Sequence, residues 1–198
     1  MRPANVVKRA KSLIGEKYAE AAQKGNVHIW NIGKKGYESL SKSGHKTDAR
    51  FKDIFLNLTF EAVQQAAQAA MKAYESKEYD VVEIIYSQFK NAATQRFEVE
   101  RFLPIPKASG TENKTQTDFI FDPNRDQLIS ELMPKILNTQ LYKAVLDANA
   151  SEHGARMTAM DKASENANEM LRGLKISYNR ARQAAITTEL TEIVSGAA

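Results

Sequence analysis

The pattern of apolar and polar positions divides the sequence into two stretches with different periodicities. Up to about residue 105, segments with apolar residues at helical spacing alternate with short strand-like apolar runs. Such alternation predicts a layered, Rossmann-like α/β domain whose strands are at least partly parallel. The predicted helices cover residues 4–23, 34–43 and 61–76, and the predicted strands cover residues 27–32, 81–86 and 97–102.

Capping and turn residues place several boundaries in this first stretch. Thr59 is a suitable N-cap for the helix that follows it, and Pro104 ends the last of these strands. A polar loop is predicted at residues 44–46 and a flexible one at residues 107–117. Residues 119–121 are predicted to add one further short strand.

The second stretch predicts one long helix, because helix formers continue almost without interruption from Asp126 to Val194. In its last part, apolar and small residues recur by alternating steps of three and four, which is a heptad pattern and predicts a left-handed coiled coil with a partner helix. No other segment of the sequence has a comparable pattern, so the partner is expected to be another chain, a second copy or a segment absent from this sequence. We call the residues of this pattern the heptad stripe: Met157, Met160, Ser164, Ala167, Leu171, Leu174, Tyr178, Ala181 and Ala185.

Composition limits both the kinds of partner and the kinds of site that the chain can have. Hydrophobic residues make up 42% and charged residues 26%, which is typical of a folded protein. The net charge of +4 would permit acidic partners, but the basic residues are spread along the chain without interleaved aromatic residues, so nucleic-acid binding is not predicted. No apolar run approaches the ~20 residues that cross a bilayer, and the first residues do not form a signal peptide. The absence of cysteine excludes disulfides, thiolate zinc sites and cysteine nucleophiles.

Candidate catalytic groups are few and scattered. His28, His45 and His153 are far apart in the sequence, and no spacing typical of metal ligands or of a Walker phosphate loop is present. Glu189 and Glu192 are three positions apart, but on an exposed helix they lack the surroundings that separate two carboxyl pKa values for acid–base work. The sequence therefore predicts no enzyme activity, no metal and no cofactor.

The most specific motif lies at the C-terminus. Residues 186–197 fill every position of the pattern Ile-Thr-x-Glu-x-x-Glu-x-x-x-Gly-Ala, and this segment closely resembles the terminal signature of F-type ATP synthase γ subunits. Residues 150–160 resemble a second block typical of that family, and weaker likenesses include residues 33–36 and 86–91. The resemblance covers essentially the whole chain.

The resemblance also implies a missing segment. Members of this family begin with a long helix, the antiparallel partner of the C-terminal helix, and then enter the α/β domain through a strand and a glycine-rich turn. This chain opens near what would be the helix after that strand. The resemblance thus implies an N-terminally truncated γ subunit and identifies the family's N-terminal helix as the partner of the heptad stripe.

By resemblance, the chain is a non-catalytic rotor that couples rotation of a proton-driven membrane ring to ATP synthesis in other subunits. Residues 1–122 would be an α/β foot domain, incomplete at its N-terminus, and residues 123–198 would form half of the coiled coil of a central shaft. The implied partners are the α, β and ε subunits and the membrane c-ring. The implied location is peripheral, on the cytoplasmic face of the bacterial inner membrane.

The resemblance assigns contact roles to five residues of the long helix. Arg182 and Gln183 match positions that contact a loop of the catalytic β subunit, with Thr187 and Glu189 one and two turns further on. Arg156 matches a position implicated in coupling. Without the signature around them, Arg156, Arg182 and Glu189 would be interpreted as solvated helix charges.

Two further groups of residues receive roles. Phe119 and Asp122 fall where the foot is expected to meet the membrane ring. Leu190, Ile193 and Val194 form an apolar stripe that would be a core stripe in a globular domain and a bearing surface on the tip of a shaft.

A second interpretation, from a different class, stays open at the level of the sequence. The chain would then be a free-standing α/β domain that dimerises through its coiled coil and binds a small ligand at the carboxyl ends of its strands.

Overall fold

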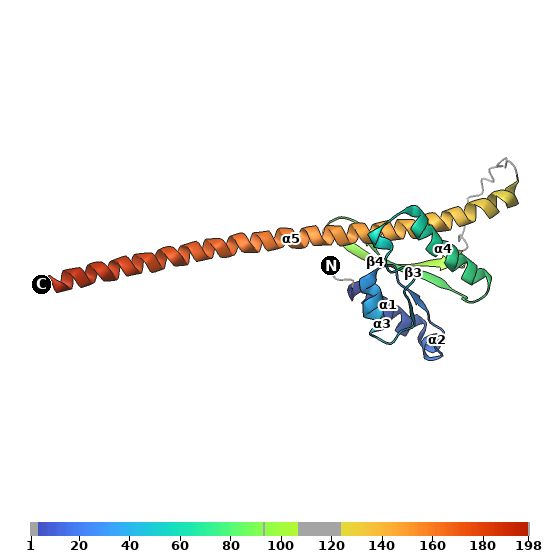
Figure 1. Cartoon of the computed structure of the whole chain (residues 1–198), viewed down its shortest axis with the longest axis horizontal. Helices are drawn as coiled ribbons and strands as arrows, with labels where there is room; N and C mark the ends of the chain where they lie inside the picture. Colours follow the sequence, from blue (N-terminus) through green and yellow to red (C-terminus); the bar gives the residue numbers. More distant parts are fainter. Residues whose placement is uncertain (1–3, 93, 107–123, 198) are drawn as a thin grey trace, which may run out of the picture. The chain divides into compact units, whose positions relative to one another are not determined.

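The computed structural model describes residues 4–92, 94–106 and 124–197 (Figure 1). Contacts between Cα atoms divide the chain into two compact units, Met1–Gly154 and Ala155–Ala198. Helix α5 (Arg125–Gly196) contributes residues to both units. The first unit contains every other described helix and strand.

The N-terminal part of the first unit is helical, but the predicted single helix over residues 4–23 is wrong. It is broken at Tyr18, whose backbone leaves the helical region with φ −122° and ψ 25°. The break follows the Lys17 ammonium, which bonds to the carboxylate of Glu83 and so ties the end of the first helix to a strand. The two resulting helices are α1 (Ala4–Lys17) and α2 (Ala19–Gln23).

The other predicted helices of the first stretch are confirmed as α3 (Lys34–Ser41) and α4 (Phe60–Glu75). The predicted cap of α4 is also confirmed, because the backbone N–H of Ala62 donates to Thr59 Oγ1 at 3.3 Å. A short 3₁₀ helix, η1 (Ile54–Leu56), precedes α4.

Four described strands form two separate two-stranded sheets. Strand β1 (Ile29–Trp30) pairs in parallel with β2 (Thr47–Asp48), while β3 (Val82–Phe89) and β4 (Gln95–Leu103) form an antiparallel hairpin. The α/β class with a long C-terminal helix is therefore confirmed, and parallel pairing in the described part is confined to β1 and β2.

The sequence prediction missed β2, which follows directly on the predicted polar loop. The backbone N–H of Ile29 donates to the carbonyl of Lys46 at 3.0 Å, so pairing with a distant strand, and not a local apolar run, makes this segment extended. The strand predicted at residues 119–121 lies outside the described residues.

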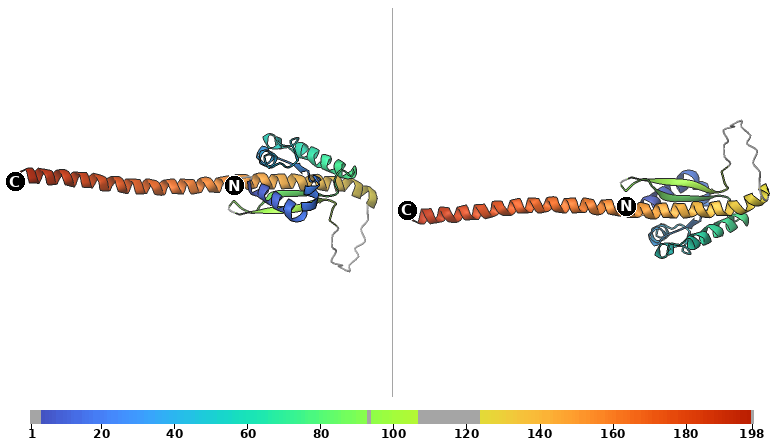
Figure 2. Two further views of the ribbon diagram at one scale, coloured as in Figure 1. Left: turned by 90° about the horizontal axis from the view of Figure 1, so that it is seen from below. Right: turned by 90° about the horizontal axis from the view of Figure 1, so that it is seen from above.

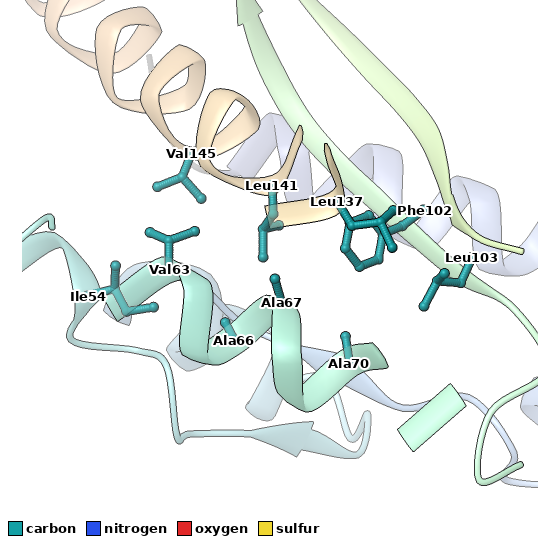
Figure 3. Packing of buried hydrophobic residues seen from close by; sticks show 10 residues of the cluster. All are labelled: Ile54, Val63, Ala66, Ala67, Ala70, Phe102, Leu103, Leu137, Leu141 and Val145. Atoms are coloured by element: carbon teal, nitrogen blue, oxygen red, sulfur yellow. The ribbon is translucent and has the colours of Figure 1, made fainter. Parts of the chain in front are cut away.

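The core of the first unit forms where α4 and the β3–β4 hairpin meet the first part of α5. Both views in Figure 2 show this part of α5 running between α4 on one side and the hairpin on the other. Small alanines on α4 allow the larger side chains of α5 to approach closely, as Figure 3 shows. The buried cluster comprises Ile54, Val63, Ala66, Ala67, Ala70, Phe102, Leu103, Leu137, Leu141 and Val145.

The second unit consists of helix alone, as the sequence predicts. From residue 159 to residue 197 every residue is exposed. None of the described helices combines the length and the apolar content that a bilayer-crossing helix needs.

Candidate functional site

The heptad stripe is exposed along its whole length. Its larger members include Leu171, Leu174 and Tyr178, which are 50%, 62% and 68% exposed. A row of large apolar side chains open to water is costly in a folded protein and is typical of a surface that binds another protein. An amphipathic helix gains most of its stability from packing, so this stretch of α5 requires a covering partner.

A second apolar surface begins where the heptad stripe ends. Ile186, Leu190, Ile193 and Val194 are between 48% and 70% exposed and gather on one side of the last turns of α5. At about 100° per residue, this side lies roughly a third of a turn around the helix from Ala181 and Ala185. We call these four residues the tip stripe: Ile186, Leu190, Ile193 and Val194.

The predicted contact residues surround the tip stripe. Arg182 and Glu189, seven positions apart and therefore on nearly the same side of the helix, line one edge of it. Gln183 falls within the stripe and Thr187 on its other edge. All four are exposed. The arrangement is an apolar strip with polar and charged groups along both margins, which is the usual anatomy of a protein-binding surface.

The polar side chains at this surface differ in whether their hydrogen-bonding or charged groups already have partners within the chain. Thr187 Oγ1 donates to the carbonyl of Gln183 at 2.8 Å, and Thr191 Oγ1 donates to the carbonyl of Thr187 at 2.7 Å, so these hydroxyl groups are satisfied within the helix. Neither Arg182 nor Glu189 forms a salt bridge with another described residue. Their charges remain available for a partner.

The other predicted positions do not join this surface. Arg156 is exposed and lies 26 positions before Arg182, about 40 Å away along a straight helix. The structure therefore places the predicted residues of α5 in two separate regions. Phe119 and Asp122 lie outside the described residues, and their assignment stays a prediction.

Sequence reasoning missed a polar contact between the hairpin and α5. The Tyr86 hydroxyl donates to Glu100 Oε1 at 2.6 Å, and Gln140 Nε2 on α5 donates to Glu100 Oε2 at 3.3 Å. Burial and, next, the hydrogen bond to the Glu100 carboxylate raise the pKa of Tyr86, so its hydroxyl stays protonated and can donate.

Further along α5, the helix and the β3–β4 hairpin approach each other more closely. Ser151 Oγ donates to the carbonyl of Ser87 at 3.0 Å, and Gln95 Nε2 donates to the carbonyl of Ser151 at 3.1 Å. A Cβ atom on Gly154 would lie 3.1 Å from the ring of Phe89, so a larger residue here would crowd the ring and require a small local shift. The small residues in the block at 150–160 could have indicated this contact from the sequence, because small side chains let a helix and a strand pack closely.

The small-ligand interpretation finds little support beside the parallel strands. The guanidinium of Arg50 lies 4.9 Å from the centre of the Trp30 ring and forms a salt bridge with Asp48 at 2.6 Å. The charges of Arg50 and Asp48 are thus paired with each other. Among the described residues, no cluster of three or more His, Asp or Glu side chains is arranged to hold a metal ion.

Comparisons with known proteins agree with the sequence resemblance. A family model described as ATP synthase matches residues 3–198. The ATP synthase gamma chain of Cytophaga hutchinsonii is 50% identical over 98% of this chain and 67% of its own length, and that of Chlorobaculum tepidum is 45% identical over 98% of this chain and 66% of its own length. The chain thus spans about two thirds of the length of these relatives.

A solved structure gives a weaker match. It is titled as the central stalk and c-ring of the Tetrahymena thermophila mitochondrial ATP synthase, and one of its chains is 22% identical with a TM-score of 0.44 over 66% of this chain and 57% of that chain. The family model covers nearly the whole sequence, and the identity to the curated gamma chains is high along the same residues. On these grounds the chain belongs to the gamma-chain family of ATP synthases.

Proposed function

We propose that this chain acts as the central-stalk rotor of a proton-translocating F-type ATP synthase, without a catalytic site of its own. The observation that carries the proposal is the exposed apolar surface of α5, which continues through the heptad stripe to the tip stripe. Membership of the gamma-chain family supports the same role.

The heptad stripe would give the rotor its stiffness. A second helix wound around α5 covers the exposed leucines and makes a rod that resists twisting better than a single helix. The occupant we propose is the N-terminal helix that the family resemblance implies. The division into a foot at residues 1–122 and a shaft at residues 123–198 is part of this proposal.

The tip stripe would provide the contact with the catalytic subunits. A rotor drives a catalytic subunit between states only by binding those states with different affinity. The charges of Arg182 and Glu189 lie on one margin of the stripe only, so the surface is asymmetric and presents a different chemistry as it turns. Gln183, Thr187 and the more distant Arg156 complete the proposed contacts with the α and β subunits.

The remaining partners would bind the α/β unit. We assign the ε subunit and the c-ring to this end of the molecule, with Phe119 and Asp122 at the contact with the ring. The protein would then be peripheral to the membrane, on the cytoplasmic face of the bacterial inner membrane, and would contribute to hydrogen ion transport and ATP synthesis through the complex.

The proposal is tested by purifying ATP synthase from native membranes with an affinity tag on this protein. Stoichiometric recovery of the α and β subunits is expected. Recovery of the tagged protein alone, or as a homodimer, would contradict the proposal and favour the free-standing α/β domain.

Site roles are tested in the purified complex with Arg182→Ala and Gln183→Ala. Both are expected to lower coupled ATP turnover while the subunit composition stays intact, because each removes a polar contact from the tip stripe. Thr188→Ala is the matched control: it lies between one and two turns further along the helix and faces away from the stripe, and its hydroxyl donates to the carbonyl of Ala184 at 2.9 Å. Equal coupled ATP turnover in all three variants would contradict the contact roles assigned to Arg182 and Gln183.

A further inference from the structure

A polar contact fixes α5 to the β3–β4 hairpin within the first unit. It contains the hydrogen bonds from Tyr86 and Gln140 to Glu100, the bonds of Ser151 with Ser87 and Gln95, and the close approach at Gly154. We call this set of residues the hairpin clamp: Tyr86, Ser87, Phe89, Gln95, Glu100, Gln140, Ser151 and Gly154.

The clamp residues of α5 share one side of the helix. Gln140, Ser151 and Gly154 are separated by 11 and 3 positions, and at 3.6 residues per turn they lie within a narrow sector of the helix. The contact with the hairpin therefore runs for about four turns along α5.

A neighbouring side of the same helix packs differently. Leu141 and Val145 face α4, and Leu137 lies beside Phe102 of β4, all within one apolar cluster (Figure 3). Apolar packing is non-directional and tolerates small rotations, whereas a hydrogen bond weakens steeply when its angle changes. The hydrogen-bonded side therefore restricts rotation of α5 about its own axis more than the apolar side does.

Burial makes the clamp sensitive to rotation. Ser151 is 2% exposed and Ser87 is 8% exposed, so water cannot readily replace the bond between them once it breaks. At Gly154, an added Cβ atom would lie 3.1 Å from the Phe89 ring and 3.3 Å from the Cα of Ala92. Rotation of α5 would therefore strain these hydrogen bonds and the close contact at Gly154.

We propose that the hairpin clamp is the element that transmits torque between the α/β unit and helix α5. This inference rests on the proposed rotor function. Ser151 and Gly154 act as positioning residues: they lock the rotation of α5 against the hairpin, so a turning force on the helix reaches the α/β unit without slippage.

The experiment measures the torsional stiffness of the rotor in the assembled ATP synthase. The complex is fixed to a surface through its catalytic subunits, without ATP, and an orientation probe is attached to a cysteine introduced at the exposed Lys42, since the chain contains no other cysteine. For Ser151→Ala and Gly154→Val, the angular variance of the probe is expected to rise about twofold or more, because loss of one buried hydrogen bond shifts a local opening equilibrium by about fivefold.

Two controls separate torque transmission from a general loss of stability. Val145→Ala weakens the apolar packing of α5 but leaves every clamp hydrogen bond in place. Glu169→Gln neutralises an exposed charge on the side of the same helix opposite the heptad stripe. Neither is expected to change the variance. An unchanged variance in Ser151→Ala, or an equal rise in Val145→Ala, overturns the inference. If the unmodified rotor does not turn on addition of ATP, the proposed function itself fails, which is a different result.

Discussion

Two stretches of helix α5 show how the same secondary structure can be stabilised in different ways. In the stretch up to Gly154, Leu137, Leu141 and Val145 are at most 8% exposed and form part of a core. From residue 159 onward every described residue is exposed, although leucines and isoleucines continue to recur. Sequence periodicity predicts a helix in both stretches, but only the first finds its packing partners within the described part of this chain.

The difference in burial separates residues that stabilise the fold from residues that are available to bind a partner. Apolar residues in the first stretch stabilise the α/β unit, and their loss should lower its free energy of unfolding. Apolar residues in the second stretch contribute little to the stability of the chain alone, and their loss should instead weaken binding of a partner. Substitutions of one residue type at the two kinds of position can therefore test the comparison.

The largest effect is expected within the core of the first unit. Phe102→Ala should lower the free energy of unfolding by about 3–5 kcal/mol, because the ring is 1% exposed and its removal leaves a cavity in the core. Urea unfolding followed by the fluorescence of Trp30, the one tryptophan of the chain, measures the change. Leu56→Ala, at a residue 86% exposed, should change it by less than about 0.5 kcal/mol. A similar loss of unfolding free energy in the two variants would contradict the placement of Phe102 in the core.

A matched pair of leucines on α5 sharpens the comparison. Leu141→Ala should cost about 2–5 kcal/mol, because this side chain is 8% exposed and packs against α4. Leu171→Ala, at a residue 50% exposed, should cost less than about 0.5 kcal/mol in the isolated chain. Far-UV circular dichroism during urea unfolding follows both stretches of the helix.

The same leucine pair should behave differently in the assembled complex. There Leu171→Ala is expected to reduce recovery of the complex, since its side chain belongs to the heptad stripe, while the cost of Leu141→Ala stays as in the isolated chain. A large cost for Leu171→Ala in the isolated chain would mean that its apolar surface is already covered.

The sequence predicted those features that depend on local chemistry. The Thr59 hydroxyl caps α4 as expected, and the long helix ends at Gly196, close to its predicted end at Val194. The exposure of Leu171 and Leu174 also follows from a heptad pattern that has no counterpart in the sequence. Local propensity and periodicity are sufficient for such features.

Features that depend on distant contacts were not predictable. Strand β2 exists because Lys46 accepts a hydrogen bond from Ile29, and the helix breaks at Tyr18 next to the bond between Lys17 and Glu83. The role of Ser151 was equally hidden, since a serine within a helical pattern does not indicate which backbone carbonyl will accept its hydrogen bond. In each case the deciding partner is far away in the sequence.

The most direct test of the rotor proposal is observation of a single assembled complex during ATP hydrolysis. With the catalytic subunits fixed to a surface and a probe on the cysteine of Lys42→Cys, the proposal predicts that addition of ATP drives the probe through repeated full turns in one direction. A probe that keeps a fixed orientation while the same complexes hydrolyse ATP would contradict it.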